Sequence, residues 1–284
     1  DAQSGTASGV TVSGVELDWS VALERKQKIV DQLYKGVQFL MKKNKVEVIA
    51  GTGVFETPTR LQVDGPDGGR TVEGTNVIIA TGSYPRSLPG VEIDGRRVIN
   101  SDHALVLKEI PKTAVIVGAG AIGVEFASMW RDLGSDVTLV EALPRVTPLE
   151  DAEVSQVISR SFTKRGIKVV AGARLDLKSV KSSDQEVSLK YDGDDGPVEL
   201  HADVLLMAVG RGANVDAIGL DKTGVKVDQG WVQVDEDLRT DDPAIFAVGD
   251  VVGGYLLAHV ASHEGIHAVE VICGASPEPL DYNH

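Results

Sequence analysis

The sequence has almost no cysteine, and this shortage excludes two common ways of stabilising a fold. Cys273 is the only cysteine among 284 residues, so neither an internal disulfide nor a cysteine-based zinc cluster can form. A lone thiol suits a reducing compartment, and we expect a cytoplasmic protein. Because Cys273 follows Val271 and Ile272 at the end of an apolar segment, we expect its side chain in the core.

Basic residues are also few. The 28 Lys and Arg residues are outnumbered by 42 Asp and Glu residues, and the net charge is −14. A surface that binds duplex nucleic acid or anionic lipid needs clustered positive charge, so we expect neither nucleic acid nor membrane as a partner. Small phosphate ligands are still compatible with this charge, because backbone N–H groups at a helix start can hold them.

Long apolar runs are missing as well. No stretch reaches the roughly 18 consecutive apolar residues that suggest a membrane-spanning helix. The first residues, Asp-Ala-Gln-Ser-Gly, lack the basic and apolar regions of a signal peptide. What remains is an ordinary globular composition, 42% hydrophobic and 25% charged, in a length typical of about two domains.

The first part of the chain predicts one long helix followed by short strands. Between Trp19 and Asn44, apolar residues recur at steps of three or four, with Lys and Arg between them. We expect this helix to cover a sheet in its own domain, and the alternative is a partner-binding helix. Short runs separated by Gly, Pro and Asp then predict strands at 46–50, 53–56, 60–63 and 70–72.

Beyond residue 76, strands and helices alternate. The apolar run Asn76–Ala80 predicts a strand buried on both faces, and a linker follows at 83–97. A β-α-β-α-β succession then predicts a parallel, doubly wound sheet, with strands at 114–117, 136–140 and 167–171 and helices at 121–133 and 152–165. Three antiparallel strands are expected within 174–201, further strands at 203–209, 231–234 and 245–248, and a last helix at 258–273.

The strongest local signal is a turn rich in glycine. Gly118, Gly120 and Gly123 have the spacing G-x-G-x-x-G between a predicted strand and a predicted helix. Gly118 permits a tight turn, Gly120 lets a pyrophosphate approach the backbone, and Gly123 lets the helix pack close to the strand. The unpaired N–H groups at the helix start would bind two phosphates. The alternative is a purely structural turn.

An acid at the end of the next strand indicates which dinucleotide would bind. Glu141 lies where its carboxylate can accept hydrogen bonds from the adenosine ribose hydroxyls of NAD. The same charge would repel the 2′-phosphate of NADP, and the nearest following arginine is Arg145. The sequence therefore predicts dinucleotide binding, with NAD preferred over NADP.

Further motifs, in order along nearly the whole chain, resemble one family. They are Ile78–Pro85 (I-I-A-T-G-S-Y-P), Gly118–Glu125 with Glu141, Ala208–Arg211 (A-V-G-R), Thr240–Val251 (T-D-D-P-A-I-F-A-V-G-D-V) and Leu257–Gly265 (L-A-H-V-A-S-H-E-G). Together they resemble the flavin-dependent pyridine nucleotide–disulfide oxidoreductases. The last motif resembles the dihydrolipoyl dehydrogenase branch of that family.

This resemblance implies FAD and NAD as cofactors and assigns residues to each. NAD would be bound by Gly118, Gly120, Ala121, Ile122, Gly123, Glu125, Glu141, Leu175 and Gly210. FAD would be bound by Gly53, Thr81, Gly82, Ser83, Asp250 and Ala258. Asp250 would hold the flavin ribityl chain, and the Ala258 N–H would lie near the flavin pyrimidine oxygen. A turn-forming acid and a strand bulge are the alternatives for Asp250 and Gly53.

Two departures from the family pattern bear on function. The segment 211–214 lacks the usual proline, so we expect a looser turn there. Nothing before Trp19 resembles the family's first G-x-G-x-x-G or its C-x-x-x-x-C disulfide, and no His-Glu base is recognisable. We therefore expect no catalytic residue in this chain and read it as the central portion of a longer enzyme that is inactive without the rest.

In a complete enzyme, the resemblance implies a homodimer that oxidises the dihydrolipoyl group of a 2-oxo acid dehydrogenase complex. Electrons would pass through the disulfide and FAD to NAD⁺. A mercuric reductase, a soluble transhydrogenase and a non-catalytic NAD-binding module are the alternatives. We expect no metal site, because His259 and His267, the outer members of a run with His263, would lie about 12 Å apart along a helix.

The expected fold is α/β, with two Rossmann-like three-layer nucleotide-binding domains and small antiparallel meanders. The resemblance implies an incomplete FAD domain at 1–88, an NAD domain at 89–214, a return to the FAD domain at 215–276, and the start of an interface domain at 277–284.

Overall fold

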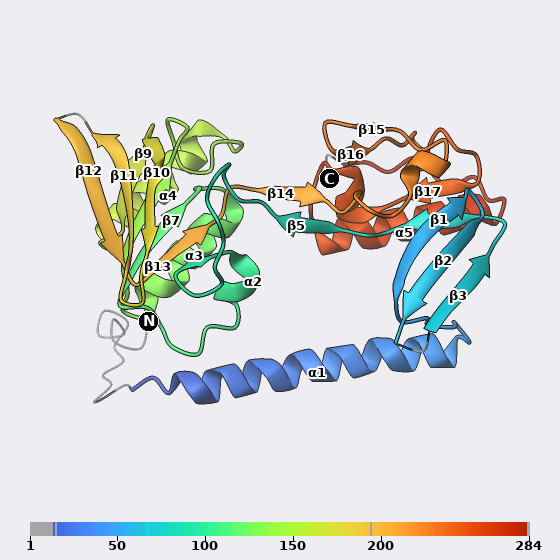
Figure 1. The fold of residues 1–284 in the computed structure, drawn as a ribbon, viewed down its shortest axis with the longest axis horizontal. Helices are drawn as coiled ribbons and strands as arrows, with labels where there is room; N and C mark the ends of the chain where they lie inside the picture. The colour runs from blue at the N-terminus through green and yellow to red at the C-terminus, as the bar shows by residue number, and fades with distance from the viewer. Residues whose placement is uncertain (1–13, 15, 67, 194, 283–284) are drawn as a thin grey trace. The chain divides into compact units, whose positions relative to one another are not determined.

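A computed structural model describes residues 14, 16–66, 68–193 and 195–282. The chain divides into two compact units (Figure 1). The first comprises Asp1–Glu47 and Leu88–Ala208, and the second comprises Val48–Ser87 and Val209–His284. Within the described ranges, no helix is both long enough and apolar enough to cross a bilayer. The domain assignment made from the sequence stays a prediction.

The first unit is built on a five-stranded parallel sheet, as the alternation of strands and helices predicts. Its strand order is β6-β13-β7-β8-β9, and every neighbouring pair in it is parallel. The strands are β6 (Val98–Ile99), β7 (Thr113–Val117), β8 (Asp136–Glu141), β9 (Lys168–Ala171) and β13 (Val204–Met207), and the helices that follow β7 and β8 are α3 (Ala121–Asp132) and α4 (Ala152–Lys164). The α/β class and the parallel sheet are confirmed.

Three layers follow from the alternation of side chains along the strands. On one face of the sheet, Ile116 and Leu206 are fully buried in a cluster that includes Trp130 of α3. On the other face, Leu205 and Met207 border an apolar space shared with an antiparallel meander. The meander consists of β10 (Arg174–Ser182), β11 (Val187–Gly193) and β12 (Gly196–Ala202). Burial of the sheet on both faces explains its continuous apolar strands.

The long N-terminal helix forms where it was predicted but does not cover a sheet. Helix α1 (Trp19–Lys43) is continuous, and the Asp18 side chain caps it by accepting from the Val21 N–H (Figure 1). None of its residues is buried. Its hydrogen bonds to the rest of the first unit run from Trp19 Nε1 to the Leu107 carbonyl, 3.0 Å, and from Lys26 Nζ to the Leu105 carbonyl, 2.7 Å. The expectation of a sheet-covering helix is therefore wrong for the described residues, because no face of α1 is buried and its hydrogen bonds to the rest of the unit come from Trp19 and Lys26 near its start.

The second unit has a smaller parallel sheet and its own meander. Strands β4 (Val77–Ile79) and β17 (Ile245–Ala247) are parallel neighbours. The meander is β1 (Thr52–Thr57), β2 (Arg60–Gly65) and β3 (Gly68–Glu73). Ile79, Ile245 and Ala247 form the core together with Phe55 of the meander. The strand expected at 46–50 is absent, since that segment has no ladder partner and leads into the meander as irregular chain.

The last helix, α5 (Ala258–Ile272), also belongs to the second unit. Its buried residues are Glu264, His267 and Ala268. Cys273 is the C-cap residue just beyond this helix, and its side chain is exposed. The expected core position of Cys273 is therefore wrong, because Cys273 continues the exposed face of α5 marked by Ile266 and Val269, whereas the buried face continues at Val271 and Ile272.

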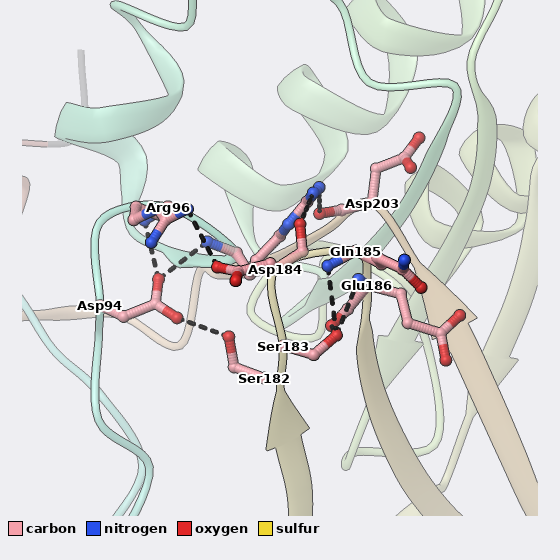
Figure 2. A network of polar contacts seen from close by, with 9 residues as sticks. Asp94, Arg96, Ser182, Ser183, Asp184, Gln185, Glu186 and Asp203 are labelled. Atoms are coloured by element: carbon pink, nitrogen blue, oxygen red, sulfur yellow. Dashed lines mark hydrogen bonds and ion pairs between the residues drawn. The ribbon is translucent and has the colours of Figure 1, made fainter.

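A polar network in the first unit fixes the turn before β6. The carboxylate of Asp94 accepts hydrogen bonds from the amides of Arg96, Arg97 and Val98, at 2.7, 2.8 and 3.0 Å, and from the hydroxyl of Ser182 at 2.7 Å (Figure 2). The Ser182 contact connects this turn to the end of β10. Partial burial alone would raise the pKa of Asp94, but these four hydrogen bonds together hold it below the ordinary value of 3.8.

We predict that Asp94→Ala lowers the free energy of unfolding by about 1–2 kcal/mol at neutral pH, because three amides and a hydroxyl lose their acceptor. Since the folded-state pKa is depressed, this contribution is present above pH 3.8 and is lost as the pH falls through the lower folded-state value. Denaturant unfolding between pH 3 and pH 7 measures both the loss of stability at neutral pH and its dependence on pH. In the matched control Asp184→Ala, an exposed carboxylate with one ion pair to Arg96 is removed, and stability should hardly change. Equal effects of the two variants would contradict the account.

Candidate functional site

The glycine turn between β7 and α3 has the geometry that its spacing predicts. Gly118 has a φ of +101°, which favours glycine. A Cβ on Gly123 would lie 1.9 Å from the Gly118 carbonyl oxygen, so only glycine permits this close approach of helix and strand. A Cβ on Gly120 would meet nothing within 4 Å. The backbone at Gly120 therefore faces open space.

The amides at the start of α3 are free to bind a ligand. Among the described residues, the N–H groups of residues 120–123, which include Ala121 and Ile122, have no hydrogen-bond acceptor. The helix has no side-chain cap and no acid in its first turn. Such a helix start carries unpaired donors and partial positive charge, which together favour an anion.

Glu141 faces this turn from the end of β8. Its Oε2 accepts a hydrogen bond from the Ala119 N–H at 2.7 Å, and its Oε1 accepts from the Leu143 N–H at 2.8 Å. The side chain is 8% exposed. Because β7 and β8 are parallel neighbours, the residues that end them meet at one edge of the sheet. A carboxylate has about four lone-pair sites, so each oxygen can still accept from a sugar hydroxyl.

The loop after Glu141 borders the candidate site. The sequence did not predict this contribution of the loop. The Thr147 N–H donates to the Ala119 carbonyl at 2.7 Å, so the loop returns to the glycine turn. Arg145 Nη2 donates to the carbonyls of Pro148 and Glu150, both at 3.0 Å, within the same loop. The guanidinium that follows the acid is thus engaged by its own loop.

The other residues assigned to NAD lie at different places. Glu125 is exposed on the first turns of α3. Leu175, at the start of β10, borders the apolar space on the meander side of the sheet together with Val117, the residue before the glycine turn. Gly210 belongs to the second unit, where its carbonyl accepts from the Arg86 N–H at 2.9 Å.

A second group of predicted residues comes together in the second unit. Asp250 lies in a short 3₁₀ helix directly after β17, and its Oδ2 accepts from the hydroxyl of Ser83 at 2.5 Å. Arg211 was not predicted as a site residue. Its Nε donates to Ser83 Oγ at 2.6 Å and its Nη2 donates to the Ser83 carbonyl at 2.7 Å. Arg211 Nε also lies 3.8 Å from Asp250 Oδ2. Arg211 therefore orients the Ser83 hydroxyl, which in turn donates to the Asp250 carboxylate.

The segment around Thr81 and Gly82 is paired with the segment that was expected to be loose. Strands β5 (Ser83–Pro85) and β14 (Arg211–Ala213) form an antiparallel ladder. Asn214 extends it, because its N–H donates to the Gly82 carbonyl and its side chain to the Thr81 carbonyl. The Thr81 hydroxyl donates to the Asn214 carbonyl at 2.7 Å. The expected looser turn is wrong, since these bonds replace the rigidity of the missing proline.

The two remaining residues predicted to bind FAD, Ala258 and Gly53, differ in how well their surroundings suit a ligand. Ala258 begins α5, which has no side-chain cap and no acid in its first turn, so its exposed first amides are suited to negative charge. Gly53 lies in β1, where a Cβ would make only ordinary contacts with Leu61 and Val63. The glycine is thus not required by packing within the described residues.

Comparison with known proteins identifies the family. The model of the family described as "Pyridine nucleotide-disulphide oxidoreductase" matches residues 4–265. The chain belongs to this family. It is 46% identical over 273 residues to a dihydrolipoyl dehydrogenase of Chlorobaculum tepidum, and 41% identical over 282 residues to one of Bacillus subtilis. Each alignment covers 96% of this chain, but 58% and 60% of the relative. The chain thus spans little more than half the length of the curated relatives it matches.

Solved structures agree with the fold of this family. The LpdA structure from Mycobacterium tuberculosis is 28% identical with a TM-score of 0.85, and the alignment covers 94% of this chain and 59% of that one. The HOCl-induced flavoprotein disulfide reductase RclA from Escherichia coli has a TM-score of 0.83 at 28% identity over 93% of this chain. Family membership implies FAD and NAD as cofactors. The uncapped starts of α3 and α5 and the two acids, Glu141 and Asp250, fit those groups chemically.

The glycine turn allows a matched pair of substitutions to separate binding from folding. We predict that Gly120→Ala keeps the thermal midpoint, because its Cβ meets no atom, but weakens NAD⁺ binding at least about tenfold by obstructing the pyrophosphate. Gly123→Ala should instead destabilise the first unit by about 3 kcal/mol, because its Cβ collides with the Gly118 carbonyl. Calorimetric unfolding and NAD⁺ titration of both variants measure this. Unchanged NAD⁺ affinity in Gly120→Ala would contradict the assignment of the turn.

Proposed function

We propose that the first unit binds NAD⁺ at the glycine turn, and that the chain serves a dihydrolipoyl dehydrogenase. The observation that carries the NAD⁺ proposal is the combination of free amides at the start of α3 with a carboxylate that faces the same turn. The pyrophosphate would accept from the amides of residues 120–123. Both adenosine ribose hydroxyls would donate to Glu141, whose position the Ala119 and Leu143 amides already determine.

The same geometry favours NAD⁺ over NADP⁺. A 2′-phosphate would lie next to the Glu141 charge in a site where the carboxylate is 8% exposed and poorly screened. The nearest guanidinium is that of Arg145, whose Nη2 already donates to the carbonyls of Pro148 and Glu150. A 2′-phosphate would therefore meet the Glu141 charge without a hydrogen bond from that nitrogen.

We predict that the chain binds NAD⁺ at least about tenfold more tightly than NADP⁺, and that Glu141→Gln reduces this ratio mainly by weakening NAD⁺ binding. Isothermal titration with each dinucleotide measures the ratio. The control is Glu109→Gln, which removes a charge from an exposed position in the loop before β7, at the opposite end of that strand from the glycine turn, and should leave the ratio between the two dinucleotides unchanged. A wild-type protein that binds both equally would refute the role of Glu141.

For the second unit we propose a partial flavin site. FAD supplies a two-electron relay between a dithiol and nicotinamide. Asp250 would accept a hydrogen bond from a ribityl hydroxyl, in an orientation held by Ser83 and Arg211. The first amides of α5 at Ala258 would stabilise negative charge on the flavin ring. Thr81, Gly82 and Gly53 would line the same cofactor.

The whole enzyme that this chain would serve oxidises the dihydrolipoyl group of a 2-oxo acid dehydrogenase complex, as a homodimer. The support for the dihydrolipoyl substrate is the name shared by the curated relatives of Chlorobaculum tepidum and Bacillus subtilis, whereas the homodimer and the 2-oxo acid dehydrogenase complex rest on the family resemblance alone. A cytoplasmic location stays a prediction. A mercuric reductase, a soluble transhydrogenase or an NAD-binding module without catalysis remain the competing outcomes of the tests.

We predict no lipoamide-dependent NADH formation by this chain alone. The reaction exchanges a substrate dithiol with a protein disulfide, and the chain carries a single cysteine. Absorbance at 340 nm with dihydrolipoamide, NAD⁺ and added FAD measures it. NADH production above the rate without protein would contradict the prediction, whereas NAD⁺ binding without turnover agrees with it.

A further inference from the structure

The most deeply buried acid of the second unit lies on α5 and contacts the turn that carries Asp250. Glu264 is 3% exposed. Its Oε2 accepts a hydrogen bond from the Gly249 N–H at 2.6 Å, and its Oε1 accepts from the hydroxyl of Tyr282 at 3.0 Å. A buried carboxylate is costly unless it is hydrogen-bonded, and here both oxygens have a partner.

The turn that Glu264 contacts has little freedom on its other sides. Gly249 has a φ of +74°, and a Cβ there would lie 3.2 Å from the Ala261 side chain of α5. The preceding N–H, that of Val248, donates to the Ile79 carbonyl of β4 at 3.0 Å. The N–H of Gly249 is the last donor before Asp250, so the bond to Glu264 determines the direction in which the chain leaves β17.

Tyr282 secures the other carboxylate oxygen. Both residues border one cavity of the second unit, together with Tyr255. Partial burial, and then the charge and hydrogen bond of Glu264, raise the pKa of Tyr282 to about 12. The phenol therefore stays protonated and donates throughout the neutral range, so Glu264 cannot turn away from Gly249 without losing a second bond.

We propose that Glu264 is a positioning residue that fixes the Gly249–Asp250 turn from α5, with Tyr282 holding the Glu264 carboxylate in place. Asp250 is then restrained from two directions: its carboxylate by Ser83 and its backbone by Glu264. The part of this proposal that concerns flavin rests on the proposed function of Asp250. The restraint on the turn itself rests only on the contacts within the second unit.

The first test measures the turn directly in the 284-residue chain, without any flavin. Glu264→Gln replaces a charged acceptor by a neutral one of the same shape, and Glu264→Leu removes it. Amide exchange at Gly249 and Asp250, followed by NMR, should accelerate about tenfold in Glu264→Gln and further in Glu264→Leu, because a charge-assisted bond is weakened and then lost. The Gly249 amide resonance should move upfield in the same order. Tyr282→Phe should give a smaller acceleration at the same two amides.

Two control variants separate this effect from general loss of stability. Glu270→Gln removes the same charge from an exposed position of α5, and Tyr255→Phe removes a hydroxyl from the same cavity. Both should leave the Gly249 and Asp250 amides unchanged. If exchange in Glu264→Gln equals that of the controls, or if all amides of the second unit accelerate alike in Glu264→Gln, Glu264 does not position this turn and the inference is overturned.

The second test asks whether the position of the turn matters for the ribityl chain. Riboflavin carries this chain and lumiflavin lacks it, so fluorescence titration with both isolates the contribution of Asp250. Glu264→Gln and Tyr282→Phe should weaken riboflavin binding severalfold and leave lumiflavin binding unchanged, as should Asp250→Ala. If Asp250→Ala does not affect riboflavin, the proposed flavin role fails while the amide result still decides on Glu264. If Asp250→Ala weakens riboflavin and Glu264→Gln does not, the positioning role in flavin binding is refuted.

Discussion

The hydrogen bonds that the amides of Ala119 and Leu143 donate to the Glu141 carboxylate are the constraint on which the NAD⁺ assignment depends. They fix the residue just before the open helix start and the loop just after β8, while the N–H groups of residues 120–123 have no acceptor among the described residues. The backbone at Gly120 faces open space, so a ligand can reach these N–H groups, which no intrahelical carbonyl satisfies. The unpaired amides next to a positioned acid therefore favour a ligand that brings its own acceptors.

The two units use a similar arrangement for different ligands. In each, an acid lies at or just beyond the end of a parallel strand and is held by hydrogen bonds from neighbouring segments: Glu141 ends β8, and Asp250 follows β17. In each, a helix without a cap or an acid in its first turn begins nearby in the sequence, α3 in the first unit and α5 in the second. Acids oriented in advance lose little conformational freedom on binding a hydroxyl, and uncapped helix starts suit phosphate or a reduced ring.

The elements that the sequence predicts well are those whose signal is local and periodic. The strands and helices between residues 113 and 171 lie within a residue or two of their expected positions, because buried apolar runs alternate with amphipathic segments. The role of Gly123 was also predictable, since its spacing from Gly118 reports the approach of helix and strand. The G-x-G-x-x-G pattern thus predicts both the packing of α3 against β7 and the position of the candidate phosphate site.

What the sequence does not predict depends on contacts between distant segments. Arg211 meets Ser83, and Tyr282 meets Glu264, only after the chain has folded, and no local pattern reports such pairs. The exposure of α1 was missed because an apolar face shows that a helix can be covered, not what covers it. Cys273 was misplaced because the two apolar residues before it, Val271 and Ile272, continue the buried face of α5, whereas the next position falls on the exposed face.

The most direct test of the central claim is an NMR titration of the chain with NAD⁺, in which the backbone amides are followed one by one. The account predicts saturable shifts of the amides of residues 120–123, together with those of Ala119 and Leu143, whose acceptor Glu141 would engage the ribose. Shifts confined to other parts of the chain, or an NAD⁺ concentration series that leaves residues 120–123 unmoved, would contradict it.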